Sequence, residues 1–209
     1  MRRVILVGVD GSPQSFGALM TALELARTFG KKVEAIAVYD PYLHYAMFNG
    51  IVGVLNEKAS KIFRFKEQEQ LHEEIIDTGL AKIYQSHLEI GRKLAAEDGV
   101  DLSITLLDGK CFEKILTFAR KEQPWLLVMG RVGVHSDEAE TDLGSNTENL
   151  LRMAPCNVLL TGGKFYPPLD VKAEEIISWT EEAEARMERV PVQVKGVART
   201  ALLRYAIEQ

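Results

Sequence analysis

The chain has 209 residues, of which 46% are hydrophobic and 26% are charged, which is ordinary for a globular protein with one α/β domain and some residues to spare. Its 25 Lys and Arg residues against 30 Asp and Glu residues give a net charge of −5. This balance argues against general binding of nucleic acid or of anionic membranes, because both require a basic surface.

Strand-like and helix-like segments alternate along most of the chain. Alternation of this kind is typical of a parallel sheet with crossover helices on both faces, so we predict an α/β fold with a five-stranded, doubly wound, Rossmann-like sheet. The predicted strands are 3–9, 33–39, 101–107, 125–130 and 157–161, and the predicted helices are 14–29, about 56–98, 111–122 and 145–153.

The connection between the second and third predicted strands is unusually long. Residues 42–55 are mostly apolar and contain several glycines, but they are too few to cross a bilayer. We interpret 42–66 as a lid or interface insertion; peripheral membrane contact is a minor alternative, since the flanks lack a basic face. Residues 57–97 are charged and amphipathic and predict one long helix or two.

The first strand ends in an acid, a glycine and a hydroxyl residue, Asp10, Gly11 and Ser12. Ser12 is a candidate cap for the following helix, which Gly30 would close. Asp10 therefore lies at the carboxyl end of a parallel strand, the edge at which open α/β sheets bind ligands. The alternative is that Asp10 is only a solvated strand end or a helix cap.

A glycine-framed loop follows the fourth predicted strand and ends where a helix begins. Gly130 and Gly133 would allow the backbone to turn and to approach a ligand closely. A helix start with free N–H groups and hydroxyls is also a natural phosphate site. Glycine turns and capping residues occur without any ligand too, so the loop alone leaves both interpretations open. The helix start reads Gly144, Ser145, Asn146, Thr147.

Taken together, these segments resemble the universal stress protein family over about residues 1–163. The resemblance rests on Asp10-Gly11-Ser12 after the first strand and on the short apolar run 35–38 at the end of the second. It rests further on the spacing of Gly130, Gly133, Gly144 and Ser145, and on the closing helix and strand, residues 147–160.

This resemblance implies binding of ATP or another adenine nucleotide. It further implies a homodimer, or a multiple of one, formed through the last strand, residues 157–161, an apolar edge that would be a pairing liability in a monomer. The implied nucleotide site uses Asp10 for the nucleoside and the backbone of Val38 for adenine. Its remaining members are Gly130, Gly133, Gly144, Ser145, Asn146 and Thr147.

The loop departs from the family pattern between Gly133 and Gly144. It has ten residues where nine are usual, and it carries four acids, Asp137, Glu138, Glu140 and Asp142. Acids close to a triphosphate repel it unless a cation intervenes. His135, Asp137 and Asp142 are weak candidates for holding Mg²⁺ or Mn²⁺; the alternative is a solvated acidic loop.

Residues 164–209 differ in composition from the rest and form a second unit in our interpretation. Residues 174–209 predict two short helices separated near Pro191, with apolar residues that must pack on the main domain or on a neighbouring subunit. This tail is similar to the small helical module at the carboxyl end of the B subunit of light-independent protochlorophyllide reductase. The similarity runs through Trp179, Glu182-Ala183, Arg186, Val190-Pro191, Lys195-Gly196 and Arg199.

Two classes of function remain open from the sequence. The first is an adenine-nucleotide-binding stress or energy-state module that is non-catalytic or at most a slow ATP hydrolase, since no known catalytic motif is present. The second is a nucleotide-free interaction protein that recruits a partner through its tail. The two cysteines, Cys111 and Cys156, lack metal-type spacing, and a reducing cytoplasm is the expected location.

Overall fold

The computed structural model describes residues 4–42, 65–134, 142–171, 177–190 and 192–208. Most of the insertion 42–66 therefore lies outside the described residues. Residues 135–141 of the acidic loop also lie outside them, including the candidate ligands His135 and Asp137.

Five parallel strands form one sheet in the order β3-β2-β1-β4-β5. The predicted α/β fold is confirmed, with strand ends that differ from the predicted ones by at most one residue. The order reverses between β1 and β4, because the chain first adds strands on one side of β1 and then on the other. The strands are β1 (Val4–Gly8), β2 (Lys32–Tyr39), β3 (Leu102–Asp108), β4 (Leu126–Gly130) and β5 (Asn157–Thr161).

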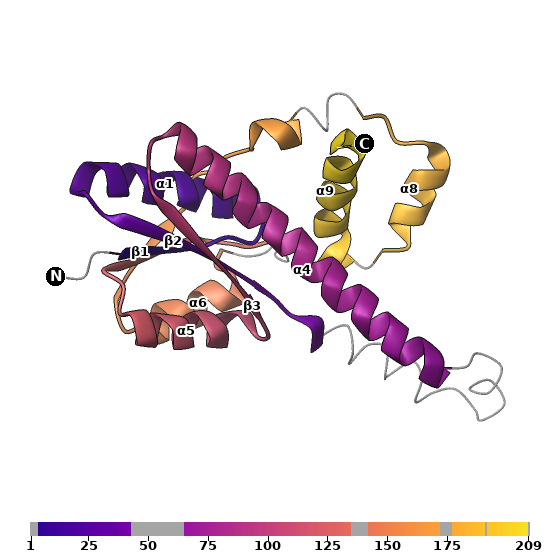
Figure 1. The fold of residues 1–209 in the computed structure, drawn as a ribbon, viewed down its shortest axis with the longest axis horizontal. Coiled ribbons are helices and arrows are strands. Elements are labelled where there is room, and N and C mark those ends of the chain that lie inside the picture. The colour runs from indigo at the N-terminus through magenta and orange to yellow at the C-terminus, as the bar shows by residue number, and fades with distance from the viewer. Residues whose placement is uncertain (1–3, 43–64, 135–141, 172–176, 191, 209) are drawn as a thin grey trace.

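Helices cover both faces of the sheet (Figure 1). Alternate strand residues face opposite ways, so Ile5 and Val7 pack under α1 and α4 while Leu6 and Ile36 pack under α5 and α6. Each face has its own buried apolar cluster, which is why the strands read as nearly continuous apolar runs. The helices are α1 (Pro13–Phe29), α4 (Phe65–Glu97), α5 (Cys111–Glu122) and α6 (Ser145–Met153).

The first helix begins and ends as its sequence predicts. The Ser12 side chain accepts a hydrogen bond from the Ser15 N–H at 3.1 Å, and Pro13 occupies the first helical position. Gly30 adopts a left-handed conformation with φ of 61°, which closes the helix. These two caps hold α1 directly behind the loop that follows β1.

The carboxyl-terminal tail contains two helices, α8 (Glu181–Glu188) and α9 (Val192–Glu208), on either side of the predicted break. Figure 1 shows α9 beside α4 and α8 beyond α9, away from the sheet. Arg204 of α9 is 5% exposed and reaches α4, where it bonds Ser86 and His87. The tail thus packs on its own chain, which was one of the two arrangements expected from the sequence.

None of the helices within the described residues is both long and apolar enough to cross a membrane.

The packing of α1 against the segment after β5 leaves no room for a side chain at Gly17. A Cβ there would overlap the carbonyl oxygen of Gly163, whereas a Cβ at Gly79 in α4 would meet nothing within 4 Å. We expect Gly17→Ala to destabilise the fold by about 1–3 kcal/mol, because backbone must move. Gly79→Ala should stabilise it by about 0.5–1 kcal/mol through helix propensity. Urea unfolding of both variants measures the contrast, and equal shifts would contradict this packing.

Candidate functional site

A cleft of about 140 Å³ opens at the carboxyl edge of the sheet, between the ends of β1 and β4. Because the strand order reverses between these two strands, their following loops diverge to opposite faces and leave a crevice. All eight residues predicted from the sequence line this cleft. They are Asp10, Val38, Gly130, Gly133, Gly144, Ser145, Asn146 and Thr147.

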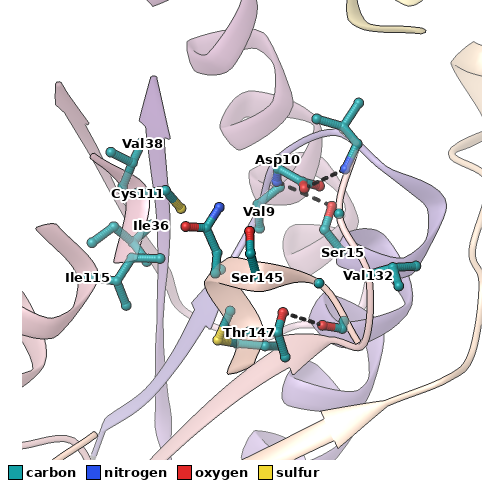
Figure 2. Close-up of a pocket in the computed structure, with 17 residues that line it drawn as sticks. Val9, Asp10, Ser15, Ile36, Val38, Cys111, Ile115, Val132, Ser145 and Thr147 are labelled. Carbon is teal, nitrogen blue, oxygen red and sulfur yellow. Dashed lines mark hydrogen bonds between the residues drawn. The ribbon is translucent and has the colours of Figure 1, made fainter. Parts of the chain in front are cut away.

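The Asp10 carboxylate joins the two loops that border the cleft (Figure 2). One oxygen, Oδ1, accepts from the Ser12 N–H at 3.0 Å and from the Ser12 hydroxyl at 2.6 Å. The other, Oδ2, accepts from the Val134 N–H at 2.9 Å, across 124 residues of sequence. Asp10 is therefore neither a merely solvated strand end nor a simple helix cap.

Two of the three loop glycines are required by contacts within the protein. A Cβ at Gly133 would lie 2.5 Å from Asp10 Oδ2, and a Cβ at Gly130 would lie 2.9 Å from Cβ and 3.1 Å from the backbone of Gln14. Neither glycine has a positive φ. The sequence predicts that these glycines allow close approach of a ligand, but the structure shows a different reason, which is the close approach of the two loops and of α1.

The first turn of α6 points its N–H groups at the cleft. The cap, Gly144, has φ of −67° and ψ of 144°, an extended conformation open to any residue, and it makes no side-chain cap. The N–H groups of Ser145, Asn146 and Thr147 come before the first intrahelical bond, which Glu148 donates to Gly144 O. A glycine cap leaves them uncovered, so this turn can accept an anion.

Thr147 has a structural duty besides its place in the lining. Its hydroxyl donates to the carbonyl of Gly130 at 3.1 Å, and the residue is only 4% exposed. Figure 2 shows this bond beneath the cleft. Thr147 thereby fixes the start of α6 to the end of β4, and its hydroxyl proton is already used within the protein.

The wall opposite Asp10 is apolar and includes residues that sequence reasoning did not select. Ile36, Ile115 and Cys111 line it beside Val38 (Figure 2). Burial raises the pKa of the Cys111 thiol to about 12, with smaller contributions from Asp10 and Asp40, so the group is a neutral thiol and a poor nucleophile. The available signal was its position, the first helical residue after β3 at the carboxyl edge.

The acidic loop enters the described structure only at Asp142. Its backbone oxygen accepts from Arg131 at 3.2 Å and 2.8 Å, and its exposed carboxylate lies 3.7 Å from the same guanidinium. Within the described part of the chain no three His, Cys, Asp or Glu side chains form a group suited to a metal ion. The candidate set His135, Asp137 and Asp142 stays a prediction.

Behind the loop after β1 lies a buried histidine, His87, that no sequence motif marks. The ring of His87, 1% exposed, packs against Gly11, whose φ is 87° and whose added Cβ would clash with the ring. Arg204 lies 2.7 Å from His87 Nδ1. Burial first and this guanidinium second lower the pKa of His87 to about 3, although Asp10 opposes the shift. The partner is 117 residues away, so no local pattern marks it.

Comparison with known proteins places these features in one family. The family model described as the universal stress protein family matches residues 1–162. Universal stress protein MJ0531 of Methanocaldococcus jannaschii is 31% identical over 156 residues, covering 75% of this chain and 79% of that protein.

Two solved structures have a similar fold. Universal stress protein UspA from Lactobacillus plantarum has a TM-score of 0.58 at 21% identity, covering 77% of this chain and 98% of its own. A universal stress protein crystallised in complex with cAMP has a TM-score of 0.52 at 21% identity, covering 78% and 98%.

The buried histidine predicts a pH dependence of stability. An unfolded His has a pKa near 6.5 and folded His87 one of about 3, so between these values the unfolded chain binds more protons. The contribution of His87 to the free energy of unfolding is present above pH 6.5 and is lost as the pH falls towards 3. The slope of this loss is at most about 1.4 kcal/mol per pH unit. The groups around the ring are Arg204, Asp10 and Tyr84.

We expect His87→Phe, which keeps a flat ring against Gly11, to remove this part of the slope. Urea unfolding at several pH values between 7 and 4.5 measures it in both proteins. Parallel stability profiles would show that His87 already takes up its proton in the folded state.

Proposed function

We propose that this chain, which belongs to the universal stress protein family, binds an adenine nucleotide in the cleft between β1 and β4 and acts as a stress or energy-state regulatory module. The observation that carries the proposal is the uncapped first turn of α6, aimed into a cleft whose opposite wall is apolar. That pairing suits a ligand with a phosphate at one end and a base at the other.

The phosphates would lie at the first turn of α6. Backbone N–H groups and the helix dipole favour negative charge there. The cleft lining contains no Lys or Arg among the described residues, and its one charged member is Asp10. A triphosphate at this turn therefore needs a counter-charge from elsewhere, and we propose that a divalent cation supplies it.

The base would lie against the apolar wall, with the Val38 backbone as its hydrogen-bonding partner. Pairing of β1 with β2 ends at Gly8 and Ile36, and the Val9 N–H still donates to Ile36 O at 2.9 Å. Backbone groups two residues apart on a strand point to the same side, so those of Val38 face the space beyond the end of β1. An adenine edge can take up both a donor and an acceptor at that position.

Asp10 would contact the nucleoside between these two ends. Its carboxylate already accepts three hydrogen bonds, and a carboxylate has about four acceptor sites. One site remains for a ribose hydroxyl. The enclosed volume of about 140 Å³ is below the roughly 300 Å³ typical of sites that enclose a whole ligand, so part of the nucleotide would extend outside it. A universal stress protein with a similar fold was solved in complex with cAMP, which supports an adenine nucleotide as the class of ligand.

The proposal does not include efficient catalysis. The described lining has a neutral thiol, Cys111, and no base paired with a nucleophile. Asp10 is held by three donors and is not placed to activate water. Phosphates that are positioned without a water-activating group hydrolyse slowly.

A nucleotide-free interaction protein is the second candidate. It is favoured by the lack of Lys and Arg in the lining and by the four acids of the loop. Mass analysis of nucleotide that copurifies with native protein, prepared with and without Mg²⁺ or Mn²⁺, separates the two. Absence of nucleotide in every preparation, together with no binding on titration, would favour the second candidate.

We also propose a homodimer formed through β5 and a cytoplasmic location. β5 is a sheet edge, and the neighbouring α6 exposes Leu151 and Met153 to 47% and 48%; exposed apolar edges of this kind pair readily. Light scattering at micromolar concentration tests the dimer, which a monomer would contradict. Neither Cys111 nor Cys156 forms a disulfide within the described part of the chain, which suits a reducing compartment.

Gly144 allows the clearest test of the nucleotide site. Its backbone conformation suits any residue, so Gly144→Val should add no backbone strain while its side chain occupies the phosphate position. We expect ATP binding, measured by calorimetry, to fall below detection. Gly162→Val is the matched control, since a Cβ there meets only an ordinary contact at 3.8 Å outside the cleft. Unchanged affinity in Gly144→Val would refute the assigned phosphate position.

Gly144→Asp separates stability from binding at the same residue. An acidic cap can accept from the first-turn N–H groups and should raise the unfolding free energy by a few tenths of a kcal/mol. The same carboxylate would compete with the phosphates for those groups and repel them. Stability should therefore rise while ATP affinity falls, an outcome that general misfolding cannot produce.

The acidic loop gives a prediction about the cation. We expect the double variant Asp137→Asn, Asp142→Asn to bind ATP more weakly than the natural chain in Mg²⁺, because the two carboxylates would hold the cation that offsets the phosphate charge. Calorimetry in Mg²⁺ and in EDTA gives the comparison. If the double variant binds ATP more tightly in EDTA and equally well in Mg²⁺, the loop is only repulsive and the cation site is wrong.

A further inference from the structure

We propose that the carboxyl-terminal helix α9 is a positioning element for the nucleotide-binding loop, acting from Arg204 through His87 onto Gly11. What the loop binds rests on the proposed function above. That α9 positions the loop is independent of it and is testable in the nucleotide-free protein.

The first link is the anchoring of Arg204. Its guanidinium binds both carboxylate oxygens of Asp170, from Nε and Nη2, at 2.7 Å each. This two-point contact fixes the plane of the group. The remaining nitrogen, Nη1, is directed at α4, where it lies 3.3 Å from Ser86 Oγ and 2.7 Å from His87 Nδ1. Asp170, which precedes α8, thus holds the buried guanidinium of Arg204 in α9 against α4.

The second link is the protonation state of His87. Arg204 is only a donor, so Nδ1 must be the acceptor and the neutral ring carries its proton on Nε2. Nε2 is buried without a partner among the described residues. The burial that lowers the pKa of His87 to about 3 keeps the ring neutral at ordinary pH. The hydrogen bond from Arg204 therefore sets the tautomer and the orientation of this ring.

The third link is the contact between the ring and Gly11. A Cβ on Gly11 would overlap Cε1, Nε2 and Nδ1 of His87, so the ring lies directly against the loop backbone. On α4 itself Tyr84 packs edge-on against the ring, with centroids 5.5 Å apart and planes at 72°. The ring is 1% exposed and contacts the loop on one side and Tyr84 on another. A change in the position of the ring therefore acts directly on the loop.

The fourth link is the neighbour of Gly11. Asp10 holds Val134, and with it the glycine loop of the cleft, through the 2.9 Å hydrogen bond. When α9 leaves its position, His87 loses the one hydrogen bond that the described residues make to it, and its ring becomes free to turn. The loop then loses its support one residue from Asp10. Tail docking and the geometry of the cleft are coupled, and by linkage a bound nucleotide must strengthen tail docking by the same factor.

The test compares Arg204→Ala with Arg199→Ala, a substitution of the same kind on the same helix. Arg199 lies over the Trp179 ring within the tail, at 4.9 Å, and is not among the residues around His87. Amide hydrogen exchange at Gly11, Ser12 and Val134 is measured in nucleotide-free protein, and ATP affinity is measured by calorimetry. In Arg204→Ala we expect exchange at Val134 to accelerate and affinity to fall, each roughly tenfold, with both near natural values in Arg199→Ala.

Asp170→Asn provides a second variant if Arg204→Ala does not fold. It loosens the anchor of Arg204 and leaves His87 and the loop intact, so the same changes should appear in smaller size. Unchanged exchange at Val134 in a folded Arg204 or Asp170 variant overturns the proposal, whatever the affinity. A third outcome is faster exchange in the variants when the natural chain itself binds no nucleotide. That outcome supports the positioning role and refutes the proposed function.

Discussion

The hydrogen bond from the Val134 N–H to the Asp10 carboxylate is the interaction on which the site depends. β1 and β4 are neighbours in the sheet, but the loops that follow them turn towards opposite faces and would otherwise separate. Asp10 closes that gap at its own strand end. The absence of a side chain at Gly133 is a consequence, since a Cβ there would sit against the same carboxylate. The Asp10 carboxylate and the missing side chain of Gly133 thus belong to the same contact, which joins the two loops at the edge of the cleft.

The sequence predicts what is local or repeated and fails where distant segments meet. Strands and helices follow from apolar runs and caps such as Ser12 and Gly30, and the parallel order brings Asp10 and Gly144 to the same edge. The reason for Gly130 is not local, because the atoms that exclude its side chain belong to Gln14 on another element. Cys111 carries no motif at all. Its place in the lining follows only from β3 ending where α5 begins.

The start of α6 shows a conflict between stability and binding. Helix starts are most stable when a Ser, Thr, Asp or Asn caps the first turn, and this chain uses such caps at Ser12 and Thr180. At Gly144, where the backbone would accept any of them, it has none. A glycine cap costs only a few tenths of a kcal/mol relative to these residues. The first turn of α6 is therefore left open at little cost in stability, and its N–H groups are available to an anion.

The tail extends the same reasoning to the other side of the loop. The Asp10-Gly11 segment is held towards the cleft by Val134 and from behind by His87. The first support lies within residues 1–162, which match the family model. The second support depends on Arg204, which lies outside that match. A protein without such a tail must support this loop in another way. Here the position of a helix at the end of the chain is physically connected to the geometry of the cleft, and a nucleotide that tightens one must tighten the other.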